Sequence, residues 1–191
     1  MSKPKIHLSL FFPAALLASC TPLAPPTTSL QEILEDKSYS LLCSNSGIDG
    51  ETIIRTTSLR SPASLNKSNN KYTSIISMQV IHPRLGPILK ARITGTQSLE
   101  ENKENFKSRF ELKEIKVTHA ASSVFGETPE ELEDEARNAA KEEASFDFKI
   151  IDENRFTYFN RDSTTICQRI PHISLDLHTL TTDSEIFKIL D

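Results

Sequence analysis

Residues that build the common catalytic and cofactor-binding motifs are scarce in this sequence. It has five glycines, and it contains no Gly-x-Ser-x-Gly, phosphate-binding glycine loop or calcium-binding loop. The histidines beyond the N-terminal segment are His82, His119, His172 and His178. They are not spaced i, i+4 on a predicted helix, and no cysteine or paired carboxylate lies around them at zinc-site spacing. The sequence therefore predicts a protein that is not an enzyme and holds no metal or cofactor.

An excess of basic residues is also absent. Lys and Arg number 22 against 26 Asp and Glu, which gives a formal charge of -4. Loss of Lys3 and Lys5 with an N-terminal signal makes this charge -6. An acidic protein is a poor candidate for binding nucleic acid or for electrostatic adhesion to anionic lipid. We expect no nucleic-acid partner.

Apolar runs long enough to span a membrane are lacking as well. The longest run, Ile6–Ala18, follows Lys3 and Lys5 and leads into small residues. This order of basic, apolar and small segments is typical of an export signal. Because no second run approaches spanning length, we expect that no protein segment holds the mature chain in a membrane.

The end of this run, Leu-Ala-Ser-Cys at 17–20, resembles the lipobox of bacterial lipoproteins, in which the signal peptidase cuts before a lipidated cysteine. By that resemblance Cys20 carries a diacylglyceryl thioether and an amine acylated by a chain such as palmitate, an anchor that is effectively stable. Thr21 at the next position directs such lipoproteins to the outer membrane, where we expect the domain to face the periplasm. The alternative is a secreted protein in which Cys20 is an ordinary thiol.

The chain divides into a signal peptide at 1–19, a lipidated tether at 20–37, a β domain at 38–170 and a C-terminal tail at 171–191. The tether begins with prolines that keep it extended, and Ile33-Leu34 predicts a short helical turn packed against the domain. In an exported protein Cys43 and Cys167 are expected to form a disulfide. The alternative is a pair of buried free cysteines.

The β domain is predicted from alternation of apolar and polar residues between positions 39 and 120 and again between 145 and 170. We expect about seven strands in an antiparallel meander that curls into a small barrel or half-barrel. Within 105–120 the apolar parity changes between Leu112 and Ile115, which predicts a β-bulge or a sharp bend. Thr128, Pro129 and Glu131 predict the capped start of one inserted acidic helix.

The lipidated start, the meandering strands, "LKARITGTQSLEEN", "FELKEIKVT", the acidic helix and the closing "ICQR" together resemble the lipocalin-like small lipoproteins of Gram-negative bacteria. The resemblance covers residues 38–170 and is one of pattern, since the Gly-x-Trp sequence of lipocalins is absent. It implies a lipocalin-like β-barrel.

Two groups of residues are candidates for function. Tyr72, Met78, Phe106 and Phe110 either line a small apolar cavity or fill the core, as side chains usually do in a small barrel. The second group, Glu130, Glu131, Glu133 and Asp134, either docks a basic envelope partner or forms the solvated, dipole-stabilised start of a helix. The first group favours a role in binding a lipid or small apolar ligand. The second favours an envelope interaction or structural role.

Overall fold

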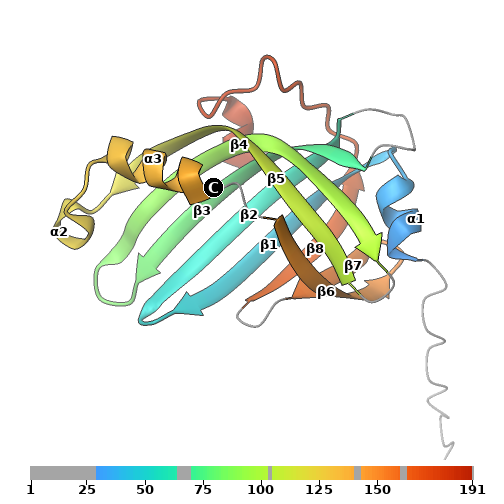
Figure 1. Cartoon of the computed structure of the whole chain (residues 1–191), viewed down its shortest axis with the longest axis horizontal. Helices are drawn as coiled ribbons and strands as arrows, with labels where there is room; N and C mark the ends of the chain where they lie inside the picture. Colours follow the sequence, from blue (N-terminus) through green and yellow to red (C-terminus); the bar gives the residue numbers. More distant parts are fainter. Residues whose placement is uncertain (1–28, 64–69, 103–104, 140–142, 160–162, 191) are drawn as a thin grey trace, which may run out of the picture.

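The computed structural model describes residues 29–63, 70–102, 105–139, 143–159 and 163–190, which form a mainly β domain (Figure 1). The strands are β1 (Tyr39–Asp49), β2 (Thr52–Pro62), β3 (Lys71–His82), β4 (Gly86–Asn102), β5 (Asn105–Ala120), β6 (Glu143–Asp152), β7 (Arg155–Phe159) and β8 (Ser163–Pro171). The helices are α1 (Leu30–Glu35), α2 (Ser122–Phe125), α3 (Pro129–Ala139) and the 3-10 helix η1 (Glu185–Ile189).

The eight strands form a closed antiparallel barrel in which each strand pairs with the next and β8 pairs with β1. Cys43 of β1 lies opposite Cys167 of β8, and the two sulfurs are bonded at 2.07 Å. The predicted meander, barrel and disulfide are thus confirmed, with eight strands in place of about seven. The strands differ in length, and β6 pairs with β5 only over Asn105–Arg109.

Irregular pairing between β4 and β5 explains the change of parity seen in the sequence. Gly95 pairs with Leu112 while Thr94 pairs with Glu114, so that Lys113 is an extra residue in β5. Such a bulge bends the strand and returns the next apolar side chains to the same face. The predicted bulge is confirmed.

Helix α1 packs against the barrel end that is remote from the β1–β2 turn (Figure 1). Ser29 caps it, accepting a hydrogen bond from the Glu32 amide at 3.1 Å while the Glu32 carboxylate accepts one from the Ser29 amide. Leu30, Ile33 and Leu34 are buried in the same cluster as the disulfide. The predicted helical turn therefore forms part of the core, although it falls in the range 20–37 assigned to the tether.

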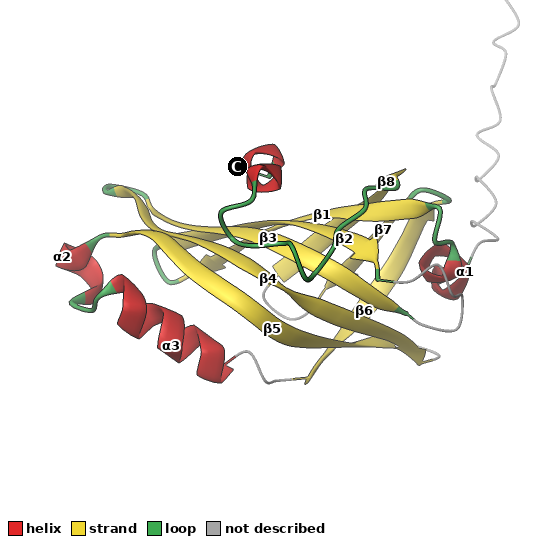
Figure 2. Cartoon of the chain, turned by 90° about the horizontal axis from the view of Figure 1, so that it is seen from above, coloured by secondary structure: helices red, strands yellow, loops and turns green. Residues whose placement is uncertain are grey.

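The segment that follows β8 packs on the outside of the barrel, where Figure 2 shows it crossing the strands. Leu180, Phe187 and Leu190 form a second buried cluster with Leu59 of β2 and Ile75 of β3. Polar contacts fix its path: the Lys113 ammonium donates to the Leu180 carbonyl at 3.0 Å, and Glu114 accepts from the Thr182 amide at 3.0 Å. The bulge in β5 thus helps to hold the C-terminal segment.

Helix α3 runs beside β5 beyond the part that pairs with β6 (Figure 2). Its start is the predicted capping box: Thr128 Oγ1 accepts from the Glu131 amide at 3.3 Å, and the Glu131 carboxylate accepts from the Thr128 amide at 2.7 Å. A second acidic side chain, Glu133, accepts a hydrogen bond from the Val117 amide of β5 at 2.8 Å. The helix therefore covers a strand edge whose amides need partners.

Candidate ligand-binding site

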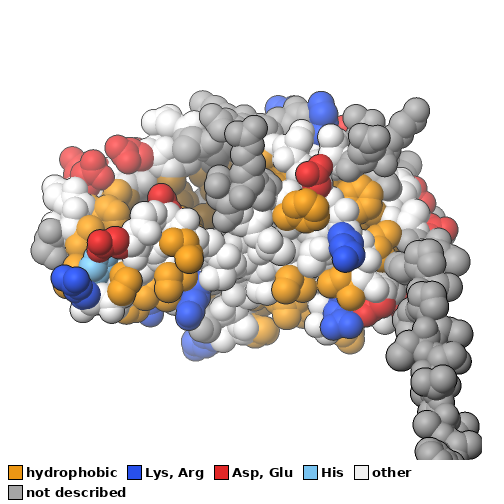
Figure 3. Space-filling model, turned by 90° about the horizontal axis from the view of Figure 1, so that it is seen from below, with side chains coloured by type: hydrophobic (Ala, Val, Ile, Leu, Met, Phe, Trp, Pro, Cys, Tyr) orange, Lys and Arg blue, Asp and Glu red, His pale blue; other side chains and the backbone are white. Residues whose placement is uncertain are grey.

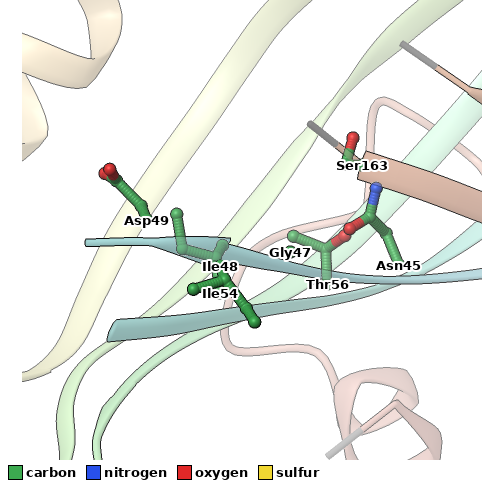
Figure 4. A pocket seen from close by; sticks show the side chains of 7 residues that line it. All are labelled: Asn45, Gly47, Ile48, Asp49, Ile54, Thr56 and Ser163. Atoms are coloured by element: carbon green, nitrogen blue, oxygen red, sulfur yellow. The ribbon is translucent and has the colours of Figure 1, made fainter. Parts of the chain in front are cut away.

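A pocket of about 570 Å³ lies at the barrel end beside the β1–β2 turn. Its walls are Asn45, Gly47, Ile48, Asp49, Ile54, Thr56 and Ser163. Figure 4 shows Asn45, Thr56 and Ser163 gathered on one side, with the isoleucines and Asp49 toward the turn. A pocket of this volume is in the range of small-molecule sites, which combine apolar walls with a few polar groups.

Strand pairing extends the inner wall from this pocket into the barrel. Thr56 pairs with Met78, Met78 with Ala91 and Ala91 with Val117, and directly paired residues share one face of a sheet. The inner face of β2 to β5 carries apolar side chains that stay partly accessible: Ile54, Ile76, Met78, Val80, Leu89, Ile93 and Val117. A filled core buries such side chains fully. The interior near the pocket is therefore apolar and incompletely covered.

The face drawn in Figure 3 carries several groups of hydrophobic side chains, with charged and polar side chains between them. Single exposed apolar residues are normal on a protein surface. We take the interior as the candidate for an apolar ligand because its partly accessible apolar side chains adjoin the pocket.

The predicted lining residues all face the interior by register, but they lie at different depths. Tyr72 and Phe106 are buried in the cluster that α1 and the disulfide share. Met78 and Phe110 are only partly buried. A Cβ added to Gly95 would lie 2.5 Å from Phe110 Cζ, so the absence of a side chain at Gly95 makes room for this ring. The barrel is filled at the α1 end and less covered toward the pocket.

Aromatic rings account for most of the filling at the α1 end. The centroids of Phe106 and Tyr158 are 5.2 Å apart in an edge-to-face arrangement, and those of Phe146 and Tyr158 are also 5.2 Å apart. Contacts of this kind stabilise beyond the area they bury. The packed aromatic side chains thus close the partly accessible interior at the α1 end.

Burial shifts the pKa values of two side chains that contact α1, Tyr72 and Lys37. The Tyr72 hydroxyl donates to the Leu34 carbonyl at 2.7 Å, and burial raises the pKa of Tyr72 while Arg60 and Arg169 oppose that rise. Burial lowers the pKa of Lys37, whose ammonium also donates to Leu34 O at 2.7 Å, and Glu35 acts in the opposite sense. Both side chains tie the end of α1 to the barrel.

A buried arginine inside the barrel was not among the residues predicted from the sequence. Arg60 of β2 is 5% exposed, and its Nη2 donates to the Tyr158 hydroxyl. Its Nε and Nη1 atoms are buried, and neither has a hydrogen-bond partner among the residues that the structure describes. In the sequence Arg60 shares the parity of Ile54, Thr56 and Ser58, but parity alone does not indicate which face of the strand is inside.

The four acidic residues predicted for partner docking differ in their roles. Glu131 belongs to the helix cap and Glu133 accepts from the Val117 amide. Glu130 and Asp134 are exposed. The structure thus gives two of these carboxylates a role within the fold.

Cys20, the predicted lipidation site, lies outside the described residues, as does the signal peptide. Among the residues that are described, no helix has both the length and the apolar character needed to cross a membrane. Comparison with models of known protein families gives no match, and a search of curated proteins finds no similar sequence.

Proposed function

We propose that this protein is a lipoprotein anchored through Cys20 in the outer membrane, facing the periplasm, where its barrel binds a lipid or small apolar ligand without catalysis. The observation that carries the binding role is the pocket of about 570 Å³ continued inward by partly accessible apolar side chains. Covering such side chains with an apolar ligand removes them from water, which stabilises the complex. The location rests on the export signal and the lipobox resemblance.

Mass spectrometry of the protein purified from membranes tests both parts of this proposal. We expect a mature chain that begins at Cys20 with its acyl chains, and native spectra that contain a noncovalently bound apolar molecule. An unmodified Cys20, or sedimentation of a Cys20→Ser variant with membranes as in the wild type, would contradict the anchor. Native spectra of the bare protein alone, together with no uptake of added fatty acids or lipids, would contradict the ligand role.

Filling the pocket with a large side chain tests whether the ligand binds there. Thr56 lines the pocket and faces inward, whereas Thr57 is its neighbour on the opposite face of β2. Thr56→Trp is expected to lower ligand uptake at least tenfold because the indole occupies the space, and Thr57→Trp serves as the control. Equal uptake by the two variants would place the ligand elsewhere.

An envelope interaction or structural role through the acidic helix or edge strands is the second candidate function. The exposed Glu130 and Asp134 favour this role, since their carboxylates remain available to a basic partner. Capture of a partner that weakens with salt and is lost in Glu130→Gln/Asp134→Asn would support it. Salt-insensitive capture would rule out the helix as the docking face.

A further inference from the structure

The interior of the barrel holds a positive charge that lacks a compensating acid. Arg60 is 5% exposed, and the ion pairs found among the described residues do not include it. Among the described residues its side chain donates one hydrogen bond, to the Tyr158 hydroxyl, and its Cζ lies 5.3 Å from the centre of that ring. A buried guanidinium normally has a carboxylate or several acceptors, because an unpaired buried charge is costly.

A second arginine, Arg169, lies near Arg60 and adds positive charge to this part of the interior. Leu41 of β1 pairs with Arg60 on one side and with Arg169 on the other, so both arginines belong to one row of the inner face. Arg169 lies 3.4 Å from Asp36, which it uses as its acidic partner, and its Nε is also buried without a hydrogen bond. Within the part of the chain that the structure describes, no acidic group pairs with Arg60.

Small polar residues surround Arg60 on its strand and on the next. Ser74 pairs with Arg60, and Ser58 precedes it on the same face. The Tyr158 hydroxyl accepts from Arg60 and can donate its own proton to another acceptor. An acid group beside the guanidinium would therefore meet hydrogen-bond donors, as charged acceptors require.

From these observations we propose that Arg60, with Tyr158, binds the carboxylate of a long-chain carboxylic acid whose apolar chain extends toward the pocket. This rests on the proposed ligand-binding role and specifies the ligand class. Thr56 of the pocket lies on the same face of β2 as Arg60, roughly 13 Å away at the rise of a strand. Ile76 and Ile93, in the row between them, present an apolar wall suited to an alkyl chain.

Fluorescence titration with 11-(dansylamino)undecanoic acid and its methyl ester tests the proposal. Every variant carries Cys20→Ala in the full chain, so that acylation does not occur. We expect the acid to bind at least tenfold more tightly than the ester, since a hydrogen bond to a charged group contributes that much or more. Arg60→Gln should remove this preference and leave ester binding within about twofold. Arg55→Gln, on the exposed face of the same strand, should retain it.

The outcomes separate this inference from the broader binding role. Equal binding of acid and ester by the protein in which Arg60 is intact would overturn the carboxylate site, while the binding role would stand. Persistence of the preference in Arg60→Gln would overturn the assignment to Arg60. Failure of both probes to bind would contradict the binding role together with this inference. Unfolding curves of each variant verify that the compared proteins are folded.

Discussion

Cys43 and Cys167 are direct cross-strand partners, with Cα atoms 4.1 Å apart, at the seam where the last strand of the barrel meets the first. Their bond joins positions separated by 124 residues. It therefore constrains the unfolded chain over most of the domain.

Reduction of this disulfide is expected to lower the free energy of unfolding by about 4 kcal/mol, chiefly by releasing the unfolded chain. Urea unfolding of the oxidised and reduced proteins measures the difference. A Cys43→Ala/Cys167→Ala variant should unfold at the same urea concentration as the reduced wild type. Coincident curves for the oxidised and reduced proteins would contradict a structural role for the bond.

Phe187 and Ile189 provide a matched test of the C-terminal segment on the outer face. Phe187 is fully buried against the barrel and Ile189 is 68% exposed on the same helical turn. Phe187→Ala is expected to cost about 3 kcal/mol or more, and Ile189→Ala about 0.5 kcal/mol or less. Urea unfolding and limited proteolysis after β8 report the two effects. Similar protease sensitivity in both variants would argue against docking of this segment.

Tyr72→Phe tests the tie between α1 and the barrel. Loss of the hydrogen bond to Leu34 is expected to cost about 1 kcal/mol at pH 7. Because burial raises the pKa of Tyr72 above the ordinary value of about 10, the phenol ionises first in the unfolded chain. The contribution of Tyr72 to stability therefore declines as the pH rises above about 10. The stability difference between wild type and Tyr72→Phe should therefore shrink between pH 9 and pH 11.

Unfolding free energies measured across this pH range provide the readout for Tyr72. Lys37 is present in both proteins, so its own lowered pKa cancels from the difference. Tyr39→Phe, which alters an exposed ring, is the control. A Tyr72→Phe difference that grows with pH would have the wrong sign for a buried neutral phenol.

Glu133 and Glu130 distinguish the structural from the solvated carboxylates of α3. Glu133→Ala removes the acceptor of the Val117 amide, and we expect exchange of that amide with deuterium to accelerate at least tenfold. Glu130→Ala should leave the rate unchanged because its side chain is exposed. Amide exchange followed by NMR measures both. Equal protection of Val117 in the two variants would contradict edge protection by Glu133.

The parts of the fold that sequence patterns predicted are those determined by neighbours in the chain. Alternation gave the strands, the parity change between Leu112 and Ile115 gave the bulge, and Thr128 with Glu131 gave the helix cap. The disulfide between Cys43 and Cys167 was predicted from the export signal, because exported proteins fold in an oxidising compartment.

Features that depend on distant partners were harder to predict. The apolar residues near Phe187 gave no sign that they pack on the outer face, because Leu59 and Ile75 also belong to alternating strands. Arg60 looked like an ordinary strand residue, since alternation alone does not say which parity faces inward when both contain polar residues. Met78 and Tyr72 share a parity, yet only the closure by α1 sets their different depths.

The position of α1 determines which end of the barrel lies next to Ser29, the first described residue. Helix α1, which Ser29 caps, lies at the end opposite the β1–β2 turn (Figure 1), and a chain from Cys20 to Ser29 reaches at most about 30 Å. The 11 residues of β1 extend roughly 36 Å. In a molecule acylated at Cys20 and standing upright, the opening faces away from the bilayer that holds the acyl chains. A bound ligand would then be exchanged with a partner on the side away from the anchoring bilayer. Exchange with the leaflet that holds the acyl chains would require the barrel to turn over.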